Sequence, residues 1–372
     1  MQLSNEQLTA VTKIKEWLAL PLTVRKPFLV TGEAGTGKST IVSYLFNNTN
    51  LRTMVVTFTG KAASVLRAKG VTANTIHSTI YTPKIVKGKL TFKRRTKKDM
   101  KGWDLIIIDE ISMVSKELLK DLSSLGVPIL AFGDFRQLPP VGDTAALKET
   151  DNNYRLNEVH RQALESNILR YARSLVDGTV YVPNPNANDL AVISYDDLGR
   201  DVVLSHDVVI CGTNNLREHY NREIRKILGF TGILQAGEKI IVLRNSPEAE
   251  VYNGEIFTVE AVQPYKNRKD IIDVTVKCPL SGKDIHLRLP LHLFTGEQVD
   301  ETVQKTYNGA MSKGNLQMAT YGYVITGHKS QGSTFERVMI LDESYVFRGM
   351  EINWLYTAVT RGSKQVTIVR EK

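Results

Sequence analysis

Short runs of apolar residues recur along the chain, and several of them are apolar at both odd and even positions. Such runs are typical of strands that are buried on both faces of a parallel sheet. We expect strands at Phe28–Thr31, Met54–Phe58, Leu105–Ile108, Ile129–Phe132, Val208–Cys211, Tyr323–Thr326 and Val338–Leu341. Apolar residues at helical spacing predict helices between them, at Asn5–Leu20, Ser39–Phe46, Ala62–Ala68, Lys116–Leu122, Asn167–Leu175 and Leu216–Leu228. Strands that alternate with helices predict an α/β fold.

The alternation is interrupted twice. Residues 79–102 contain Ile85–Leu90, which predicts a small hairpin with Lys87-Gly88 at its turn. Residues 232–310 lack helical periodicity and predict a small β-barrel inserted into the α/β framework. Its strand-like pieces, separated by Asn-Gly and Ser-Gly turns, are Lys239–Leu243, Ile256–Ala261, Ile271–Val276 and Ile285–Leu289. Tyr181–Asp189, rich in proline and asparagine, predicts a surface loop.

Composition indicates a globular protein. The chain has 372 residues, of which 42% are hydrophobic and 23% charged, which excludes wholesale disorder. At roughly 150 residues per domain, this length favours two to three domains. No apolar run approaches the roughly 18 residues of a membrane span, and the polar N-terminus does not resemble a secretory signal. The two cysteines, Cys211 and Cys278, exclude a disulfide framework and favour a reducing cytoplasm.

The formal net charge of +9 is unevenly distributed. The 18 residues from Lys84 to Lys101 hold nine basic residues and a single acid, Asp99, so this segment carries +8. A local concentration of positive charge indicates a polyanion partner. The alternative is a solvated, flexible loop that only aids solubility.

Residues Gly32–Ser39 match the phosphate-binding pattern G-x-x-x-x-G-K-[ST] between a predicted strand and a predicted helix. The glycines let backbone N–H groups surround phosphate oxygens, and the helix N-terminus adds a favourable dipole. Lys38 can reach the β- and γ-phosphates, and the Ser39 hydroxyl can ligate Mg²⁺. The alternative is a Gly-rich turn with a solvent-facing lysine, and the strand–loop–helix context disfavours it.

Two acids, Asp109 and Glu110, follow the buried run Leu105–Ile108. In a P-loop fold the acid at the strand tip faces Mg²⁺, directly or through water, and the adjacent carboxylate can orient and deprotonate the attacking water. The pair therefore favours hydrolysis over transfer to an organic acceptor. The alternative is a pair of ordinary acids at a helix start.

Two glutamines have more than one interpretation. Gln137 follows the strand Ile129–Phe132 within a Gly133–Pro140 segment and could sense the γ-phosphate, since an amide both donates and accepts hydrogen bonds. A proline-terminated surface turn is the competing interpretation. Gln7 fits a capping box with Ser4 at a helix start. It could instead read the edge of an adenine, although periodicity alone favours the cap.

Taken in order, the motifs resemble those of superfamily 1 DNA helicases of the 5′-to-3′ group, the RecD-like and phage Dda-like branch. The resemblance runs from residue 4 to residue 366 and depends on an ordered series, which is far more specific than any single motif. The series comprises Leu3–Gln7, Gly32–Ser39, Thr59–Ala63, Thr75–Ser78, Asp109-Glu110, Gly133–Pro140, Glu158–Gln162, Gly327–Thr334 and Tyr356–Arg361.

The resemblance implies two RecA-like domains with parallel sheets and ATP in the cleft between them. The first would be residues 1–150, with a basic wedge hairpin inserted at 79–102. The second would combine 151–231 with 311–372, and 232–310 would form an SH3-like β insertion beside the DNA channel. This insertion prediction also depends on Val251-Tyr252-Asn253-Gly254-Glu255, a stretch similar to the family's.

The resemblance also assigns residues to roles, with ATP and Mg²⁺ as cofactors. Catalytic roles fall to Lys38, Asp109, Glu110, Gln137, Arg161 and Arg361, with both arginines directed at the γ-phosphate from the second domain. Nucleotide contacts fall to Gln7, Gly32, Gly35, Thr36, Gly37, Lys38, Ser39, Thr40, Gln331 and Gly332, and Mg²⁺ ligation to Ser39 and Asp109. DNA contacts fall to Thr59, Gly60, Lys61, His77, Lys89, Phe92, Arg94, His328, Lys329, Ser330 and Thr334. Hydroxyls, amides and lysines suit phosphate contacts that do not read sequence.

The function expected from this resemblance is an ATP-dependent helicase that moves 5′-to-3′ on single-stranded DNA and unwinds duplex at a fork. We expect it to act as a cytoplasmic monomer, with replication or recombination proteins as further partners and no membrane partner. The direction rests on the resemblance alone. One alternative is an ATP-switched loader or recombination mediator that binds single strands without processive unwinding. Another is a P-loop enzyme such as a small-molecule kinase, against which the paired acids count.

Overall fold

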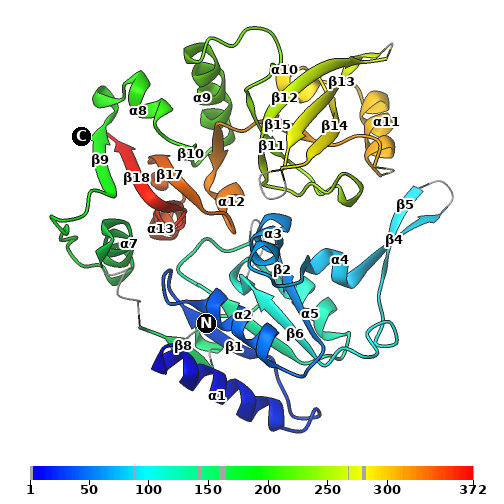
Figure 1. Cartoon of the computed structure of the whole chain (residues 1–372), viewed down its shortest axis with the longest axis vertical. Coiled ribbons are helices and arrows are strands. Elements are labelled where there is room, and N and C mark those ends of the chain that lie inside the picture. The colour runs from blue at the N-terminus through cyan, green and yellow to red at the C-terminus, as the bar shows by residue number, and fades with distance from the viewer. Residues whose placement is uncertain are drawn as a thin grey trace.

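The computed structural model describes residues 3–371 except 87–88, 141–144, 152, 159–164, 267, 279–281 and 313. Two parallel sheets and one antiparallel sheet organise these residues, and a two-stranded hairpin extends from the first sheet's half of the molecule (Figure 1). The α/β architecture with parallel sheets predicted from the hydrophobic pattern is confirmed.

The first sheet is six-stranded, in the order β3-β2-β6-β7-β1-β8, and all its described pairs are parallel. Its strands are β1 (Phe28–Gly32), β2 (Thr53–Thr57), β3 (Ala73–Thr75), β6 (Leu105–Asp109), β7 (Ile129–Gly133) and β8 (Tyr154–Leu156). The helices around it are α1 (Asn5–Ala19), α2 (Lys38–Asn48), α3 (Gly60–Ala68), α4 (Ile76–Ile80) and α5 (Lys116–Ser123).

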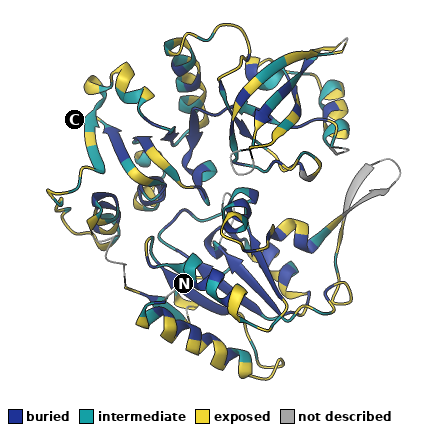
Figure 2. Cartoon of the chain, in the orientation of Figure 1, coloured by how far each residue is buried: buried dark blue, intermediate teal, exposed yellow. Residues whose placement is uncertain are grey.

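The central strands of the first sheet are buried on both faces, as Figure 2 shows. Val30 and Ile107 pack in one apolar cluster with residues of α1, α2 and α3, whereas Leu29 and Ile106 pack in a second cluster with residues of α4 and α5. Helices on both sides of the sheet explain why these strands are apolar at consecutive positions.

The second sheet is five-stranded and parallel, in the order β16-β10-β17-β18-β9. Its strands are β9 (Leu190–Ser194), β10 (Val208–Cys211), β16 (Val324–Thr326), β17 (Phe335–Leu341) and β18 (Gly362–Arg370). Its helices are α7 (Asn167–Asp177), α8 (Arg200–Leu204), α9 (Asn214–Ile227), α12 (Gly327–Ser330) and α13 (Glu351–Val359). The loop predicted at Tyr181–Asp189 has no helix or strand.

The third sheet has the order β14-β13-β12-β11-β15, and its described pairs are antiparallel. Its strands are β11 (Lys239–Val242), β12 (Ile256–Tyr265), β13 (Arg268–Lys277), β14 (Asp284–Pro290) and β15 (Ala319–Tyr321). β15 lies beyond residue 310, the end of the predicted insertion. The division of the chain into domains stays a prediction.

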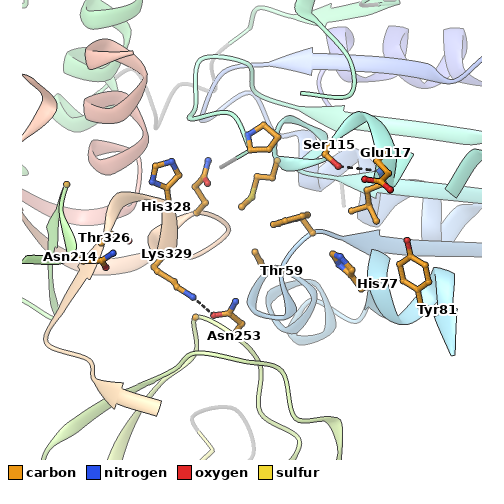
Figure 3. A pocket seen from close by; sticks show the side chains of 17 residues that line it. Thr59, His77, Tyr81, Ser115, Glu117, Asn214, Asn253, Thr326, His328 and Lys329 are labelled. Carbon is orange, nitrogen blue, oxygen red and sulfur yellow. Dashed lines mark hydrogen bonds between the residues drawn. The ribbon is translucent and has the colours of Figure 1, made fainter. Parts of the chain in front are cut away.

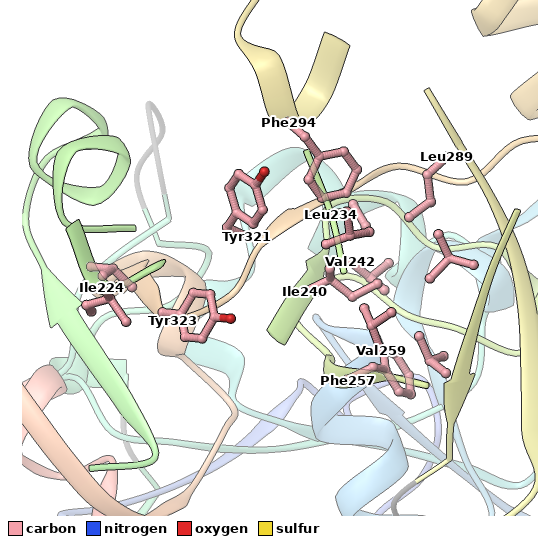
Figure 4. Close-up of a cluster of buried hydrophobic side chains, with 14 of the residues drawn as sticks. Ile224, Leu234, Ile240, Val242, Phe257, Val259, Leu289, Phe294, Tyr321 and Tyr323 are labelled. Carbon is pink, nitrogen blue, oxygen red and sulfur yellow. The ribbon is translucent and has the colours of Figure 1, made fainter. Parts of the chain in front are cut away.

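The third sheet shares an apolar core with one face of the second sheet (Figure 4). Ile224 of α9 and Tyr323, which precedes β16, belong to the same buried cluster as Ile240, Val259 and Phe294. The chain passes from β15 to β16 across only two residues, Gly322 and Tyr323, so one strand of each sheet lies on nearly continuous backbone.

The expectation that residues 232–310 lack helical periodicity is wrong. Helix α10 covers His292–Thr295 and α11 covers Glu301–Ser312. The helix α11 buries Tyr307 against Ile271 and Leu316, while most of its other residues are polar. Its apolar residues nevertheless lie on one helical face, at i, i+4, i+7 and i+8, and pack in the same cluster: Val303, Tyr307, Ala310 and Met311.

The hairpin predicted around Lys87-Gly88 is confirmed in its strands, whereas its turn lies outside the described residues. β4 (Tyr81–Val86) and β5 (Lys89–Arg94) pair antiparallel, with Tyr81 opposite Arg94. β5 lies beside α11 of the third sheet's region (Figure 1). None of the described helices is both long and apolar enough to cross a membrane.

Candidate functional site

The phosphate-binding loop connects β1 to α2. Gly35 and Gly37 have φ values of 85° and 77°, in the left-handed region that favours glycine. A Cβ on Gly32 would lie 2.6 Å from Oγ1 of Thr36 and 3.1 Å from Cβ of Leu156, so a side chain there would crowd the loop. The backbone N–H of Thr40 donates to the carbonyl of Gly37 within the first turn of α2.

The Lys38 ammonium lies inside this loop. Its Nζ donates to the carbonyl oxygens of Gly32 at 2.6 Å and Glu33 at 2.9 Å. The charge is therefore held on the concave side of the loop, where phosphate oxygens would be surrounded by backbone N–H groups. Bound phosphates would offer it stronger, charge-assisted partners than these two carbonyls.

The two acids lie at the tip of β6, beside the loop. The Ser39 hydroxyl donates to Oδ2 of Asp109 at 3.5 Å. Burial raises the pKa of Asp109, and the nearby Lys38 charge partly opposes that shift. Glu110 has φ 59° and ψ 47°, a left-handed conformation that costs a non-glycine residue about 1 kcal/mol or more. Strain of this kind at a strand tip is typical of functional sites.

Glu110 is placed to act on a proton. Burial, followed by the charge of Asp109, raises the pKa of Glu110 to about 7, while Arg361 and Lys38 lower it. Its Oε2 atom is buried and has no hydrogen-bond partner among the described residues. A buried acceptor without a partner can hold a water molecule. This arrangement suits a carboxylate that orients and deprotonates an attacking water.

Ser39 and Asp109 are a donor set that fits Mg²⁺. The ion prefers oxygen ligands and is bound through one or two carboxylates together with substrate phosphates. No group of three or more His, Cys, Asp or Glu side chains that could hold a metal occurs in the described part of the chain. The ion would therefore depend on the nucleotide as well as on the Ser39 hydroxyl and the Asp109 carboxylate.

Gln137 lies on the loop after β7. Its Nε2 donates to Oδ2 of Asp134 at 3.4 Å, and its buried Oε1 has no partner among the described residues. Gln137 is only 5% exposed, so the proline-terminated turn that holds it is covered at this position, and its role toward the γ-phosphate stays a prediction. The adjoining Leu138 connects to the second sheet's half: its N–H donates to Oγ1 of Thr357 at 2.8 Å.

Arg361 reaches the site from the second sheet's half, at the end of α13. It is 6% exposed and donates to the carbonyls of Thr357 and Ser333 and to Oγ1 of Thr360. The positive charge of Arg361 lowers the pKa of Glu110, so the two side chains interact across the boundary between the halves. Arg161, the second predicted arginine, lies outside the described residues.

Gln7 forms the capping box predicted from the sequence. The N–H of Ser4 donates to Oε1 of Gln7 at 3.0 Å, and the N–H of Gln7 donates to Oγ of Ser4 at 3.3 Å. The side chain also contacts the phosphate-binding loop, since its Nε2 donates to the carbonyl of Thr36 at 3.4 Å. The cap is confirmed, and adenine recognition stays a prediction.

A cleft of about 770 Å³ lies between the two parallel-sheet halves and is open to solvent (Figure 3). Five residues with predicted roles line it, four assigned to DNA and one to nucleotide: Thr59, His77, His328, Lys329 and Gln331. The first two come from the first half and the others from the second. Burial lowers the pKa of His77, His328 and Lys329. Near pH 7 both histidines are therefore neutral hydrogen-bonding groups.

The other residues predicted to contact DNA lie elsewhere. Ser330 is fully buried and its hydroxyl donates to the carbonyl of Gly327, whereas Thr334 is exposed outside the cleft. Gly60 packs directly against Tyr252. Lys61 lines a separate pocket between α3 and the third sheet's region. The side chains of Lys89 and Phe92 are outside the described part of the chain.

Two residues predicted to bind nucleotide, Gln331 and Gly332, also lie at the contact between the halves, and their nucleotide role stays a prediction. Gln331 Nε2 donates to the carbonyl of Leu138 at 2.8 Å. Gly332 has φ 71°, and a Cβ there would lie 2.9 Å from Oγ1 of Thr59 and 3.1 Å from Cβ of Ala62. A side chain at position 332 would therefore collide with the first half, so glycine allows the two halves to approach closely there.

Sequence reasoning missed several residues of the cleft. Phe58, Ser115, Glu117, Asn214 and Asn253 line it without having been predicted to do so. Lys329 Nζ donates to Oδ1 of Asn253 at 2.8 Å, which connects the second half to the third sheet's region (Figure 3). The signal for Asn214 was present, since a polar Thr-Asn pair follows a buried strand and starts a helix.

The base of the hairpin is fixed to α5. Asp121 accepts hydrogen bonds from the Tyr81 hydroxyl and from the Arg94 guanidinium. Tyr81 opposes Arg94 in the hairpin and also lines the cleft. The Tyr81 hydrogen bond lowers the pKa of Asp121 and raises that of Tyr81 to about 12. Arg94, predicted to bind DNA, therefore has a protein partner that orients the hairpin.

This geometry defines a P-loop protein with two parallel-sheet halves that meet at the nucleotide site. A family model described as an AAA domain matches residues 2–197, and one described as a UvrD-like helicase C-terminal domain matches residues 321–369. Because the first model covers more than half of the chain, the chain belongs to the AAA-domain family.

Known relatives confirm the resemblance to RecD-like superfamily 1 helicases. The chain is 28% identical to the ATP-dependent RecD2 DNA helicase of Deinococcus radiodurans over 90% of its own length, but it spans only 45% of that relative. It is 21% identical to the ATP-dependent DNA helicase Pif1 of Campylobacter jejuni, over 91% of this chain and 87% of the relative. A solved structure of two coordinating Pif1 helicases on forked DNA has a TM-score of 0.62 at 21% identity, covering 99% of this chain and 92% of that one, and shows the same fold.

Proposed function

We propose that this chain is an ATP-dependent DNA helicase that moves 5′-to-3′ along single-stranded DNA and separates duplex at a fork. The observation that carries the proposal is a connection between two sites. The hydrogen bonds of Leu138 with Thr357 and Gln331 join the P-loop site to the open cleft that the same two halves line. The helicase names of the relatives support the activity, and the RecD and Pif1 families support the direction.

In this proposal the nucleotide binds at Gly32–Ser39, with Lys38 at the β- and γ-phosphates. When bound, Mg²⁺ neutralises phosphate charge and helps to position the phosphates. Glu110 orients and deprotonates the attacking water, Gln137 senses the γ-phosphate and Arg361 neutralises its charge. Because Arg361 and Gln331 belong to the second half, occupancy of the nucleotide site controls how closely the halves approach.

The cleft in Figure 3 is the proposed path of the strand. The hydroxyl of Thr59, the two neutral imidazoles and the ammonium of Lys329 suit contacts to phosphates, and contacts of that kind are largely independent of sequence. Cyclic approach and separation of the halves would let each half hold the strand in turn. A monomer contains all of these parts, so we propose the monomer as the active form in the cytoplasm.

We also propose that the β4–β5 hairpin is the wedge that separates the duplex and that the third sheet is an SH3-like element beside the strand. The hairpin extends from the first half, lies in the most basic segment of the sequence and is fixed to α5 through Asp121. Replication or recombination proteins are proposed as further partners because the relatives are DNA helicases.

The test is unwinding of forked duplexes that carry either a 5′ or a 3′ single-stranded tail, with and without ATP. We expect strand separation only with ATP and only when a 5′ tail is present. Binding without strand separation on every substrate would instead favour the alternative, an ATP-switched loader or recombination mediator.

Replacing Asp121 tests the wedge separately from the ATPase. We expect Asp121→Asn to slow unwinding of a forked duplex about tenfold, because a charge-assisted anchor of about 1.4 kcal/mol is lost. DNA-stimulated ATP hydrolysis should stay within about twofold of the wild type.

Asp177→Asn is the matched control, since Asp177 forms an exposed ion pair with Arg173 on α7, away from the hairpin. It should leave both activities unchanged. Equal unwinding by Asp121→Asn and Asp177→Asn would show that the hairpin's anchor has no role in strand separation.

A further inference from the structure

Tyr356 belongs to α13 of the second half, but its hydroxyl contacts two segments of the first half. The N–H of Ala34, in the phosphate-binding loop, donates to Oη of Tyr356 at 2.8 Å. The same hydroxyl donates to Oδ2 of Asp134, after β7, at 2.7 Å. Tyr356 is 1% exposed, so this hydroxyl has exchanged water for these two partners.

Asp134 extends the connection to the γ-phosphate sensor. Its Oδ2 also accepts from Nε2 of Gln137 at 3.4 Å, and its Oδ1 accepts from the N–H of Arg136 at 3.0 Å. Burial and the Asp134 charge raise the pKa of Tyr356 well above its ordinary value, so the hydroxyl stays protonated and keeps donating. The Tyr356 hydroxyl therefore contacts the phosphate-binding loop directly. It reaches the amide of Gln137 through the Asp134 carboxylate.

Other contacts from the second half hold the backbone around Gln137. Asn353 Nδ2 donates to the carbonyl of Arg136 at 2.9 Å, and the N–H and carbonyl of Leu138 bond to Thr357 and Gln331. These contacts fix the backbone, whereas among the described residues the side chain of Gln137 is bonded by Asp134, which Tyr356 holds. A phenylalanine at 356 would keep the buried ring and remove only the hydroxyl.

We propose that Tyr356 is a positioning residue for ATP hydrolysis, whose hydroxyl orients Asp134 and thereby aligns the Gln137 amide with the γ-phosphate. Since Tyr356 lies on the second half, the alignment is complete only while the two halves are in contact. ATP hydrolysis is thereby coupled to the approach of the two halves. The inference rests on the proposed function, of which it specifies one coupling step.

The test compares Tyr356→Phe with the wild type in ATP hydrolysis at saturating Mg²⁺ and oligothymidylate. We expect kcat to fall about tenfold and KM for ATP to change less than about twofold, because an interaction that matters in the transition state is lost while the phosphate contacts remain. The control is Tyr171→Phe, which removes a hydroxyl that accepts from Arg370 at 2.8 Å in the same half. This control should match the wild type.

A double-mutant cycle separates positioning from general loss of structure. In a Gln137→Ala background, adding Tyr356→Phe should lower kcat no further, because the hydroxyl acts through Gln137. Independent, multiplicative losses would overturn the proposal, as would an unchanged kcat in Tyr356→Phe alone. Should Tyr356→Phe unfold below the assay temperature, Asp134→Asn replaces it, and an unchanged kcat there overturns the proposal too.

The same series distinguishes this inference from the proposed function. If the wild type shows no DNA-stimulated hydrolysis, the proposed function fails. If the wild type hydrolyses ATP and Lys38→Ala does not, the proposed nucleotide site holds, and Tyr356→Phe together with the double-mutant cycle decides the inference.

Discussion

Lys38→Ala should lower DNA-stimulated ATP hydrolysis by two to three orders of magnitude, about 10²–10³-fold, and abolish unwinding. Its ammonium lies within the phosphate-binding loop, held by the carbonyls of Gly32 and Glu33. Alanine removes the positive charge that would meet the β- and γ-phosphates and leaves the loop's glycine conformations unchanged. The measurement is steady-state phosphate release together with unwinding of a 5′-tailed fork.

Binding of single-stranded DNA is the internal control for Lys38→Ala. The cleft residues belong to other elements, so affinity for an oligonucleotide without ATP should stay within a few-fold of the wild type, roughly the scatter expected for distant sites. Lys13→Ala, at an exposed position on α1, is the matched control for loss of a lysine and should be fully active. Unwinding of a 5′-tailed duplex by Lys38→Ala would contradict the proposed mechanism.

Glu110→Gln should lower kcat for ATP hydrolysis by about 10²–10⁴-fold, because a general base would be lost. Glutamine has nearly the same shape and can adopt the same left-handed backbone, so nucleotide affinity should be retained or increased. Removing a negative charge beside the γ-phosphate also reduces repulsion of ATP. Single-turnover hydrolysis and direct nucleotide binding separate the two effects.

The control for Glu110→Gln is Glu16→Gln, an exposed change on α1 that removes the same charge far from the site. It should leave kcat unchanged. If Glu110→Gln hydrolyses ATP at a rate within about tenfold of the wild type, the general base is another residue. Tight ATP binding without turnover would support Glu110 in that role.

Much of the parallel framework could be predicted because both faces of each central strand are buried. Leu105–Ile108 shows the principle: alternate residues enter two different apolar clusters, so the strand is a continuous apolar run. β18 was not predicted, because its first residues, such as Lys364 and Gln365, are polar. Of this strand, Val366–Val369 are buried. The helix α11 was missed although Val303, Tyr307 and Met311 recur at helical spacing, because the strand-like pieces before it favoured a β-barrel.

At the nucleotide site, the sequence placed the first half well because its chemistry lies in contiguous motifs. Lys38, Ser39, Asp109 and Glu110 follow the ends of two predicted strands and meet where those strands end. Contacts between the halves were harder to predict, because they depend on how two sheets face each other. The contacts of Gln331 with Leu138 and of Gly332 with Thr59 show that limit, because no sequence pattern indicated them.

The core that the third sheet shares with the second sheet has a consequence for folding. Ile224, Val324 and Val259 belong to a single buried cluster, so neither sheet can lose its packing without exposing the apolar surface of the other. Cooperative unfolding units follow such shared surfaces rather than the order of residues in the chain. The second and third sheets should therefore melt in one transition, and their slowest amide hydrogens should exchange at a common rate. The long segment between β10 and β16 is thus part of the same folding unit as the second sheet. Deleting this segment would remove part of the apolar core of the second sheet.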